Sequence, residues 1–208
     1  MGVKKFAVLA SGGGTDFQSL IDAVKKGQIK AEICCLIAGK PDIYAIERAE
    51  KAGIPVKVVC KKDFTDNESF DIAVRDALVE AEADFAVLAG YLSIIGPETI
   101  KVFPNKIINI HPALIPSFCG MGYYGHHVHN AVLESGVKLS GATIHFVDET
   151  ADTGPIIMQE TVPVLVDDTV ESLAIRVLKK EHEMLPKAVA LMAEGRLQVE
   201  GKKVRITE

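Results

Sequence analysis

The sequence predicts an α/β protein with a doubly wound, mostly parallel sheet, helices on both faces, and an antiparallel element in the C-terminal half. Three observations support this prediction. Several short segments are apolar throughout, as expected for parallel strands that are buried on both faces. Amphipathic segments of helical period separate them. The first apolar segment stops at the glycines of SGGGTDFQ, a strand-to-helix turn typical of doubly wound folds.

The first half of the chain alternates strands and helices. Residues 4–10 form an apolar strand that ends at the triple glycine 12–14. The next helix has apolar residues at i, i+3, i+4 and i+7 counted from Phe17, and Thr15 or Asp16 is its expected N-cap. The further elements expected up to residue 110 are strands at 31–37, 55–59, 83–90 and 106–110, and helices at about 42–51 (capped by Asp42 and ended by Gly53), 68–82 and 96–103.

The second half differs in character. Residues 111–130 are rich in Gly, Pro, His and Tyr, which predicts a loop followed by a helix that begins near His129. Two strands, one long helix and a terminal hairpin should follow. We expect the strands at 141–147 and 156–164, the helix from Asp168 with a capping-box-like pair of Asp168 and Glu171 and a kink or break at Pro186, and the hairpin turn at Gly201-Lys202. No linker is evident, so we expect a single domain, 1–208.

The bulk properties limit the classes of partner. A net charge of -5 and a pI near 5.7 disfavour a general nucleic-acid or membrane-surface binder. No apolar run is long enough for a membrane span. The four cysteines lack zinc-site spacing and suggest free thiols in a reducing, cytoplasmic compartment. These properties do not exclude a small anionic ligand, because a nest of backbone N–H groups can bind one on an acidic protein. We expect no metal site, and a monomer or homodimer as the assembly.

The glycine-rich segment 11–18 is the first candidate site. Glycines let the backbone approach an anion, and the following helix N-terminus offers free N–H groups. The third glycine of a dinucleotide fingerprint is absent, since Phe17 stands there, and no Walker lysine follows. A single phosphate is therefore a better candidate than a dinucleotide, and the alternative is a tight turn that binds no ligand.

The segment INIHPALIPSF contains the second candidate. On an extended strand end, Asn109 and His111 point to the same side because they are two residues apart. An amide and a protonated imidazole can both donate hydrogen bonds to a developing oxyanion. Pro112 and Pro116 would hold the exit path of the chain rigid. The alternative is a structural histidine at the end of a strand.

The third candidate is Asp152, in the segment DETADTGPI. A carboxylate near His111 would raise the pKa of the imidazole by favouring its charged form. The alternative is a turn aspartate, a common role for Asp near Gly. Asp148 and Glu149 are also candidates, and the pattern does not choose among the three.

Together these segments resemble the folate-dependent formyltransferase family. The resemblance covers almost the whole chain and rests on SGGGTDFQSLIDA, LAGYLSII, INIHPALIPSF, GATIHFVDETADTGPII and KKEHEMLP. It implies a formyltransferase-like, Rossmann-type fold. It also implies a one-carbon transferase of de novo purine biosynthesis, which moves a formyl group from 10-formyltetrahydrofolate to the amine of glycinamide ribonucleotide without a metal.

The resemblance also implies roles for individual residues. Asn109 and His111 would act on the formyl oxygen, and Asp152 would support the histidine and assist proton movement. Residues 1–110 would form the ribonucleotide phosphate-binding half, and 111–208 would supply the folate-site loop, the catalytic Asp loop and the C-terminal helix. The binding residues implied are Gly14, Thr15, Asp16 and Glu181 for the ribonucleotide, and Asn67, Leu92, Ser93, Ile94, Ile95 and Asn109 for the folate.

The chain departs from the family pattern in three places. Asp16 stands where many members have Asn, and a carboxylate there would repel a phosphate unless it binds through its backbone N–H or only caps the helix. Asn67 and Ser93 stand where others have Arg, so the folate tail would be held differently. The segment 119–132 is longer than in some members, and its aromatic and histidine side chains would form either a lid over the folate site, which we favour, or a plain surface loop.

Three other functions are alternatives to the one that the resemblance implies. Methionyl-tRNA formyltransferase is disfavoured because it carries an extra C-terminal domain and this chain is not basic. A 10-formyltetrahydrofolate hydrolase is the nearest enzymatic alternative, since the same three residues with water as acceptor would release formate. A non-catalytic nucleotide-binding module would require the coincidence of Asn109, His111 and Asp152 to be accidental.

Overall fold

The computed structural model describes residues 2–208 and contains a nine-stranded sheet with the order β3-β2-β1-β4-β5-β6-β7-β9-β8. The strands are β1 (Lys4–Ala10), β2 (Ala31–Ala38), β3 (Val56–Val58), β4 (Phe85–Leu88), β5 (Ile107–His111), β6 (Leu139–Phe146), β7 (Ile156–Pro163), β8 (Leu197–Glu200) and β9 (Lys203–Ile206). The helices are α1 (Thr15–Lys25), α2 (Tyr44–Ala52), α3 (Asn67–Glu80), α4 (Pro97–Val102), α5 (His126–Ser135) and α6 (Val170–Ala193), with a short 3₁₀ helix at Lys61–Asp63.

The sheet confirms the predicted fold class. Strands β1 to β5 are all parallel, while β6 pairs antiparallel with both β5 and β7, and β8 pairs antiparallel with β9. The chain leaves β1 toward β2 and later returns to β4 on the other side of β1. This reversal of strand order creates a crevice beyond the carboxyl ends of the strands, where open α/β sheets bind their ligands.

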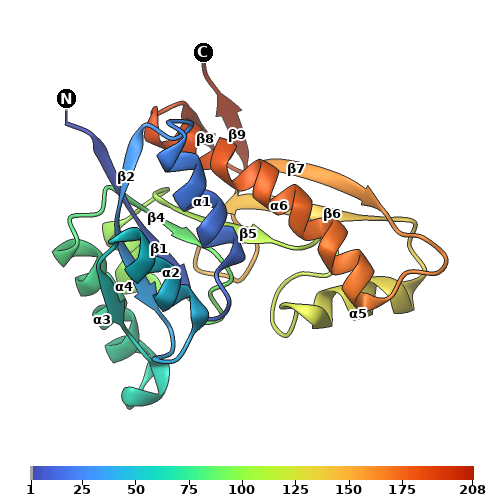
Figure 1. Ribbon diagram of the computed structural model, residues 1–208, viewed down its shortest axis with the longest axis horizontal. Helices are drawn as coiled ribbons and strands as arrows, with labels where there is room; N and C mark the ends of the chain where they lie inside the picture. Colours follow the sequence, from blue (N-terminus) through green and yellow to red (C-terminus); the bar gives the residue numbers. More distant parts are fainter. Residues whose placement is uncertain (1) are drawn as a thin grey trace.

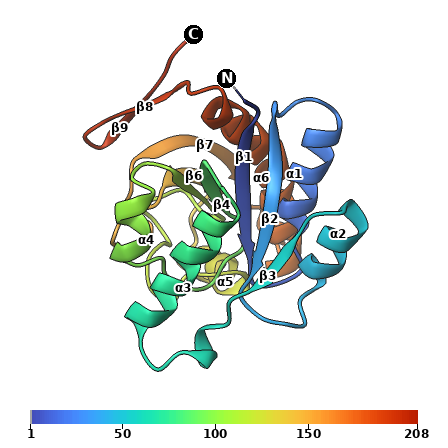
Figure 2. The same ribbon diagram turned by 90° about the vertical axis from the view of Figure 1, so that its left-hand side faces the viewer.

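Helices cover both faces of the sheet, as Figures 1 and 2 show. Helices α1, α2, α5 and α6 pack on one face, and α3 and α4 pack on the other. Strand β1 shows the consequence for the sequence, since Phe6 and Val8 enter the first hydrophobic cluster while Ala7 and Leu9 enter the second. Both sets of side chains are buried, and this explains why the strand is apolar throughout.

Two predicted helix starts were wrong. Gly14 precedes α1 in a left-handed conformation (φ 68°), so neither Thr15 nor Asp16 is the N-cap. A Cβ on Gly14 would lie 2.7 Å from the Cβ of Ala45, which explains why this position requires glycine. Helix α2 begins after Ile43, and Asp42 makes no capping hydrogen bond. In both places the packing of the loops overrides the local capping preference.

The start of α6 also differs from the prediction. Thr169 is the N-cap and forms a capping box with Ser172, whereas Asp168 pairs with Arg176 (2.8 Å between Oδ2 and Nη1). Pro186 does not divide the helix, which continues to Ala193. Side chains buried against the sheet on both sides of the proline, Met184, Leu185, Ala188 and Val189, outweigh the backbone hydrogen bond that the proline cannot make.

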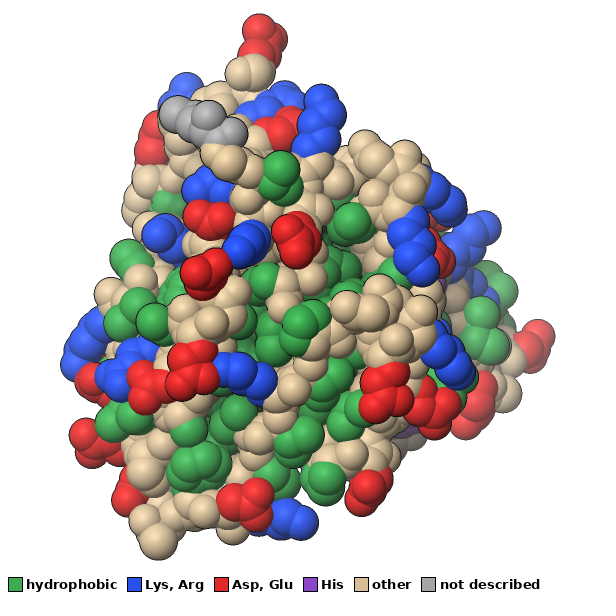
Figure 3. Space-filling model, turned by 60° about the vertical axis from the view of Figure 1, so that its left-hand side comes forward, with side chains coloured by type: hydrophobic (Ala, Val, Ile, Leu, Met, Phe, Trp, Pro, Cys, Tyr) green, Lys and Arg blue, Asp and Glu red, His purple; other side chains and the backbone are tan. Residues whose placement is uncertain are grey.

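Helix α5 starts at His126, earlier than expected, while the terminal hairpin follows the prediction. In residues 2–208 no helix is long and apolar enough to cross a membrane. The face drawn in Figure 3 carries acidic and basic side chains interspersed among hydrophobic ones, and neither charge dominates it.

Candidate active site

A cavity of about 760 Å³ lies beyond the carboxyl ends of β4 and β5. Its walls come from the segments that follow β4, β5 and β6 and from helices α5 and α6. The predicted site residues that line it are Asp16, Leu92, Ser93, Ile94, Ile95, Asn109, His111, Asp152 and Glu181. Gly14, Thr15 and Asn67 do not line this cavity, and Asn67 is exposed in the first turn of α3.

Strands β5 and β6 place four polar side chains on one face of the sheet. Asn109 is directly opposite His145, and His111 is directly opposite Thr143. Directly opposite residues of an antiparallel pair share a face, and so do residues two apart on one strand. The pairing therefore brings together Asn109, His111, Thr143 and His145 by backbone geometry alone.

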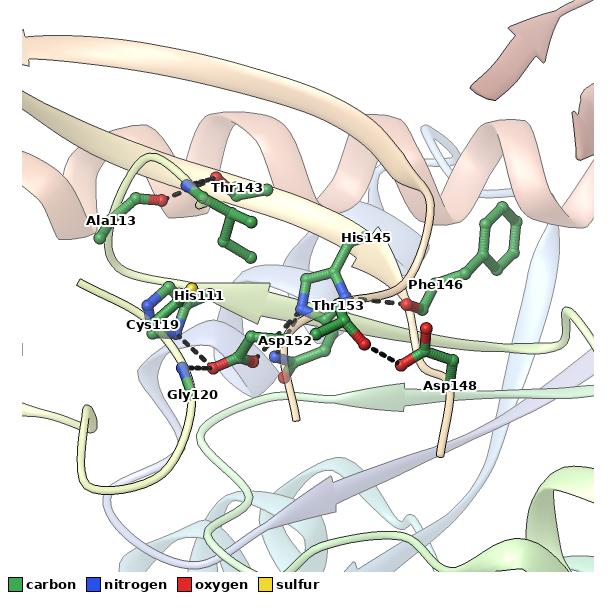
Figure 4. Close-up of polar contacts among 12 residues, drawn as sticks. His111, Ala113, Cys119, Gly120, Thr143, His145, Phe146, Asp148, Asp152 and Thr153 are labelled. Atoms are coloured by element: carbon green, nitrogen blue, oxygen red, sulfur yellow. Dashed lines mark hydrogen bonds and ion pairs between the residues drawn. The ribbon is translucent and has the colours of Figure 1, made fainter. Parts of the chain in front are cut away.

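Asp152 lies between the two histidines, as Figure 4 shows. Its Oδ2 is 3.7 Å from Nδ1 of His111, and its Oδ1 is 3.5 Å from Nε2 of His145. The backbone N–H of Gly120 donates to Oδ2 at 2.8 Å. Asp152 has a left-handed backbone (φ 58°), which is uncommon for a residue with a side chain and aims the carboxylate back at the strands.

His145 orients the amide of Asn109. Nδ1 of His145 lies 2.8 Å from the carbonyl oxygen of Phe146, which can only accept, so Nδ1 carries the proton. In the neutral ring, Nε2 is then an acceptor for Nδ2 of Asn109 at 3.1 Å. This hydrogen bond uses one N–H of the Asn109 amide and leaves the other free for a ligand in the cavity.

His111 is 4% exposed, and burial lowers the pKa of its imidazole below the usual value. The charge of Asp152 raises this pKa, as expected for a nearby carboxylate, but burial outweighs it and the net shift is downward. His111 is therefore neutral at pH 7. Nε2 lies 2.8 Å from the carbonyl oxygen of Phe118, so this nitrogen carries the proton and donates it to the loop.

The pKa of Asp152 is lowered. Burial raises it, but the nearby ring of His145, the hydrogen bond from the N–H of Gly120 and the proximity of His111 together outweigh burial. Asp148 has a different role, because it accepts from the hydroxyl of Thr153 at 2.7 Å and from the backbone N–H of Thr150. Glu149 is exposed. The structure thus selects Asp152 among the three acidic candidates of this loop.

Thr143 fixes the segment that follows His111. Its hydroxyl donates to the carbonyl of Ala113 at 2.7 Å and accepts from the N–H of Ile115 at 3.1 Å (Figure 4). Gln159 donates to the carbonyl of Ile115 at 2.9 Å. Side-chain hydrogen bonds from β6 and β7 therefore fix the segment after His111. From the sequence, its rigidity is expected to come from Pro112 and Pro116.

A second polar group lies at another part of the cavity wall, where Asp16 of α1 meets Glu181 of α6. Burial raises the pKa of Asp16 to about 6, and burial together with the charge of Asp16 raises the pKa of Glu181 well above its usual value. Nε2 of His182 lies 3.6 Å from Oδ1 of Asp16. Neither atom has a hydrogen-bond partner in residues 2–208, and Glu181 is 7% exposed. These groups are placed to hydrogen-bond a ligand.

The segment 119–125 forms part of the cavity wall. Gly120, Met121, Gly122, Tyr123 and Tyr124 all line the cavity, which supports the role of a cover over the site. Phe118 and Tyr123 make an edge-to-face contact with ring centroids 6.5 Å apart. The carbonyl of Phe118 meets His111 and the N–H of Gly120 meets Asp152, so this segment is tied directly to the central residues.

The sequence did not single out several residues that the structure places at the cavity or its edge, among them Thr143, His145, His129 and Lys61. The first two had a signal, because GATIHFV carries polar residues two apart within an apolar strand. His129 and Lys61 had none, since their positions depend on how α5 and the segment after β3 pack. Across residues 2–208, no group of three or more His, Cys, Asp and Glu side chains is arranged to hold a metal ion.

Comparisons with known proteins agree with this arrangement. The phosphoribosylglycinamide formyltransferase of Haemophilus influenzae is 39% identical over 95% of this chain and 91% of its own length. The chloroplastic enzyme of the same name from Vigna unguiculata is 44% identical over 93% of this chain, and the trifunctional purine biosynthetic protein adenosine-3 of Gallus gallus is 43% identical over 94%. The aligned part is 62% of the Vigna protein and 19% of the Gallus protein.

Solved structures give the same result. Glycinamide ribonucleotide transformylase 1 of Symbiobacterium toebii superposes with a TM-score of 0.94 at 39% identity, covering 99% of this chain and 95% of that one. A formyltetrahydrofolate deformylase of Pseudomonas syringae gives 0.90 at 27% identity, covering 100% of this chain and 67% of that one. The family model for formyl transferases matches residues 4–189, and the chain belongs to the formyl transferase family.

Proposed function

We propose that the chain transfers the formyl group of 10-formyltetrahydrofolate to the amine of glycinamide ribonucleotide, in purine biosynthesis and in the cytoplasm. The observation that carries this proposal is the placement of Asn109, His111 and Asp152 around one cavity. The carboxyl groups of Asp16 and Glu181 lie in another part of its wall. The relatives from Haemophilus influenzae (39% identical) and Vigna unguiculata (44% identical) bear the name phosphoribosylglycinamide formyltransferase, which supports the same choice of acceptor.

The chemistry needs donors for an oxyanion and an acceptor for a proton. The neutral amine attacks the formyl carbon, and a negative charge develops on the formyl oxygen. The free N–H of Asn109 donates to this oxygen, and His111 donates from Nε2 once the oxygen takes the place of the Phe118 carbonyl. The attacking nitrogen becomes cationic and loses a proton to the region of Asp152, directly or through water. The bond between the formyl carbon and N10 of the folate then breaks, N10 takes up a proton, and tetrahydrofolate leaves.

The two ends of the cavity suit the two substrates. Leu92, Ile94 and Ile95 supply an apolar wall for the pteridine ring, and Ser93 lies between them. Asp16 and Glu181 mark the ribonucleotide end. Gly14 and Thr15 lie beside Asp16 at the start of α1, where backbone N–H groups are available to a phosphate.

The second candidate is a 10-formyltetrahydrofolate hydrolase, in which water replaces the amine. The structural similarity to the Pseudomonas syringae deformylase supports this alternative. The buried Oδ1 of Asp16 weighs against it, because Asp16 lines the cavity and this atom has no hydrogen-bond partner in residues 2–208. A water acceptor needs no second substrate site.

The test incubates the protein with both substrates and measures the release of tetrahydrofolate. We expect release that depends on glycinamide ribonucleotide. Formate release without the ribonucleotide would favour the hydrolase, and binding without either reaction would favour a non-catalytic module. In His111→Ala the rate should fall on the order of 100- to 1000-fold, the usual effect of removing one oxyanion donor. A His111→Ala variant with near-normal turnover would refute the mechanism.

A further inference from the structure

A second, smaller cavity of about 410 Å³ adjoins the first one. The two share three lining residues, Lys61, Leu92 and Ser93. The walls of the small cavity come from the segments that follow β1, β2, β3 and β4, because the carboxyl ends of these parallel strands meet at one edge of the sheet. Its position next to Leu92 puts it at the end of the apolar wall proposed for the pteridine ring.

The small cavity is basic. Lys40, Lys61 and Lys62 line it, and Asp42 is the one acidic side chain among its lining residues. Within the described part of the chain, residues 2–208, none of the three ammonium groups lies within 4.0 Å of a carboxylate. The cavity thus has an excess of two positive charges on a protein whose net charge is -5. Such a local excess attracts anions.

The backbone around this cavity is held in place. The N–H of Leu92 donates to the hydroxyl of Ser11 at 3.1 Å, and the N–H of Ser11 donates to the carbonyl of Gly90 at 3.0 Å. The N–H of Gly39 donates to the carbonyl of Ala10 at 2.9 Å. The N–H of Val59 donates to the carbonyl of Ala38 at 3.0 Å. Backbone hydrogen bonds therefore attach the segments before Lys40 and Lys61 to neighbouring strands, and Leu92 is attached to Ser11.

The geometry points to a binding subsite for the glutamate tail of the folate, formed by Lys61, Lys62 and Lys40. This inference rests on the proposed function. A folate places its pteridine at one end and its glutamates at the other, and each further glutamate adds one carboxylate. Lys61 is common to both cavities, so it meets the first glutamate, while Lys62 and Lys40 meet the carboxylates that follow. Asn67, expected at the folate from the resemblance, lines neither cavity.

The test compares the mono- and triglutamate forms of 10-formyltetrahydrofolate in the wild type and in a Lys61→Gln/Lys62→Gln variant. The wild type should have a several-fold lower KM for the triglutamate, because each exposed charge pair contributes up to about fivefold. This preference should shrink as salt rises. The double variant should lose most of this preference, through a higher KM for the triglutamate. Lys40→Gln should show a smaller loss.

A matched control is Lys25→Gln/Lys26→Gln, which removes the same charge from the far end of α1. It should keep the tail preference. Calorimetric binding of mono- and triglutamyl 5-formyltetrahydrofolate tests the subsite without turnover, so failure of the proposed reaction does not hide the result. An unchanged tail preference in the Lys61/Lys62 variant would overturn the subsite. A raised KM for the ribonucleotide alone would also overturn it, by assigning the cavity to the phosphate.

Discussion

Asp16 has a charge that changes within the pH range of a working enzyme. Its pKa is raised to about 6 by burial, so it is mostly neutral at pH 5 and mostly charged at pH 8. The titratable or charged groups near it are Glu181, His182 and Arg48. His182 has a lowered pKa, because of burial and of Arg48, and gives Asp16 no compensating charge at neutral pH. A charged Asp16 would repel a phosphate bound at the start of α1.

The change Asp16→Asn should therefore improve ribonucleotide binding at high pH. The ratio of the wild-type KM to the variant KM should be near one at pH 5 and should rise above pH 6 to about tenfold at pH 8, since two charges near a protein surface repel by about 1 to 4 kcal/mol. The titration of the phosphate itself cancels in this ratio. Steady-state kinetics from pH 5 to 8 measures it. A ratio independent of pH would mean that Asp16 is only a structural residue.

The lowered pKa of His111 also changes an assignment made from the sequence. A protonated imidazole was expected, but burial keeps the ring neutral at pH 7. The donor is then the Nε2–H that already points at the Phe118 carbonyl. The carboxylate of Asp152 lies 3.7 Å from Nδ1, and its charge favours the cation that forms if His111 takes a proton on this nitrogen during the reaction.

His129 of helix α5 lines the cavity and also affects the stability of the fold. This side chain is 5% exposed, its Nδ1 has no hydrogen-bond partner in residues 2–208, and burial lowers its pKa to about 4. The unfolded chain has a histidine pKa near 6.5 and so binds a proton first as the pH falls. The contribution of neutral His129 to stability is therefore present above pH 6.5 and is lost between pH 6.5 and about 4.

A His129→Leu variant should not show this loss of stability at low pH. Its free energy of unfolding, minus that of the wild type, should rise as the pH falls from 7 to 5, by at most about 1.4 kcal/mol per pH unit. Urea unfolding at both pH values measures it. The control is His127→Leu, an exposed position on the same helix, for which the difference should stay constant. Equal behaviour of the two variants would contradict the argument.

The continuous sheet makes the two halves of the chain one structural unit. Strand β5 of the first half pairs with β6 of the second, and α1 packs beside α6 on the same face (Figure 1). One hydrophobic cluster contains Phe6 and Phe17 from the first half and Phe146 and Leu173 from the second. We therefore propose that 1–208 is a single domain, in which neither half buries its apolar surface alone.

Unfolding should accordingly be one cooperative transition. We expect the loss of far-UV circular dichroism in urea and the labelling of the buried thiol of Cys35 to share one midpoint. The first signal is dominated by helices from both halves, including α6, while the thiol reports on β2 in the first half. Labelling of Cys35 at a clearly lower urea concentration would mean that residues 1–110 form a separate folding unit.

Several features of this protein were determined by the sequence alone. The apolar segments predicted the parallel strands β1, β2, β4 and β5, because burial on both faces favours apolar residues throughout. The two-residue spacing of Asn109 and His111 predicted that they share a face, because side chains alternate along a strand. The apolar period of α1 and the glycine that ends α2 were also readable, since each depends on a few neighbouring residues.

Only the tertiary structure decided the rest. The choice of Asp152 over Asp148 depends on how the loop between β6 and β7 folds back on β5, and His145 and Lys61 reach the cavities from segments distant in sequence. The pKa of His111 depends on burial, which outweighs the opposite effects of the Asp152 charge and of the hydrogen bond with the Phe118 carbonyl. These properties are set by distances and solvent exclusion between segments far apart in the chain, and no local pattern of residues encodes them.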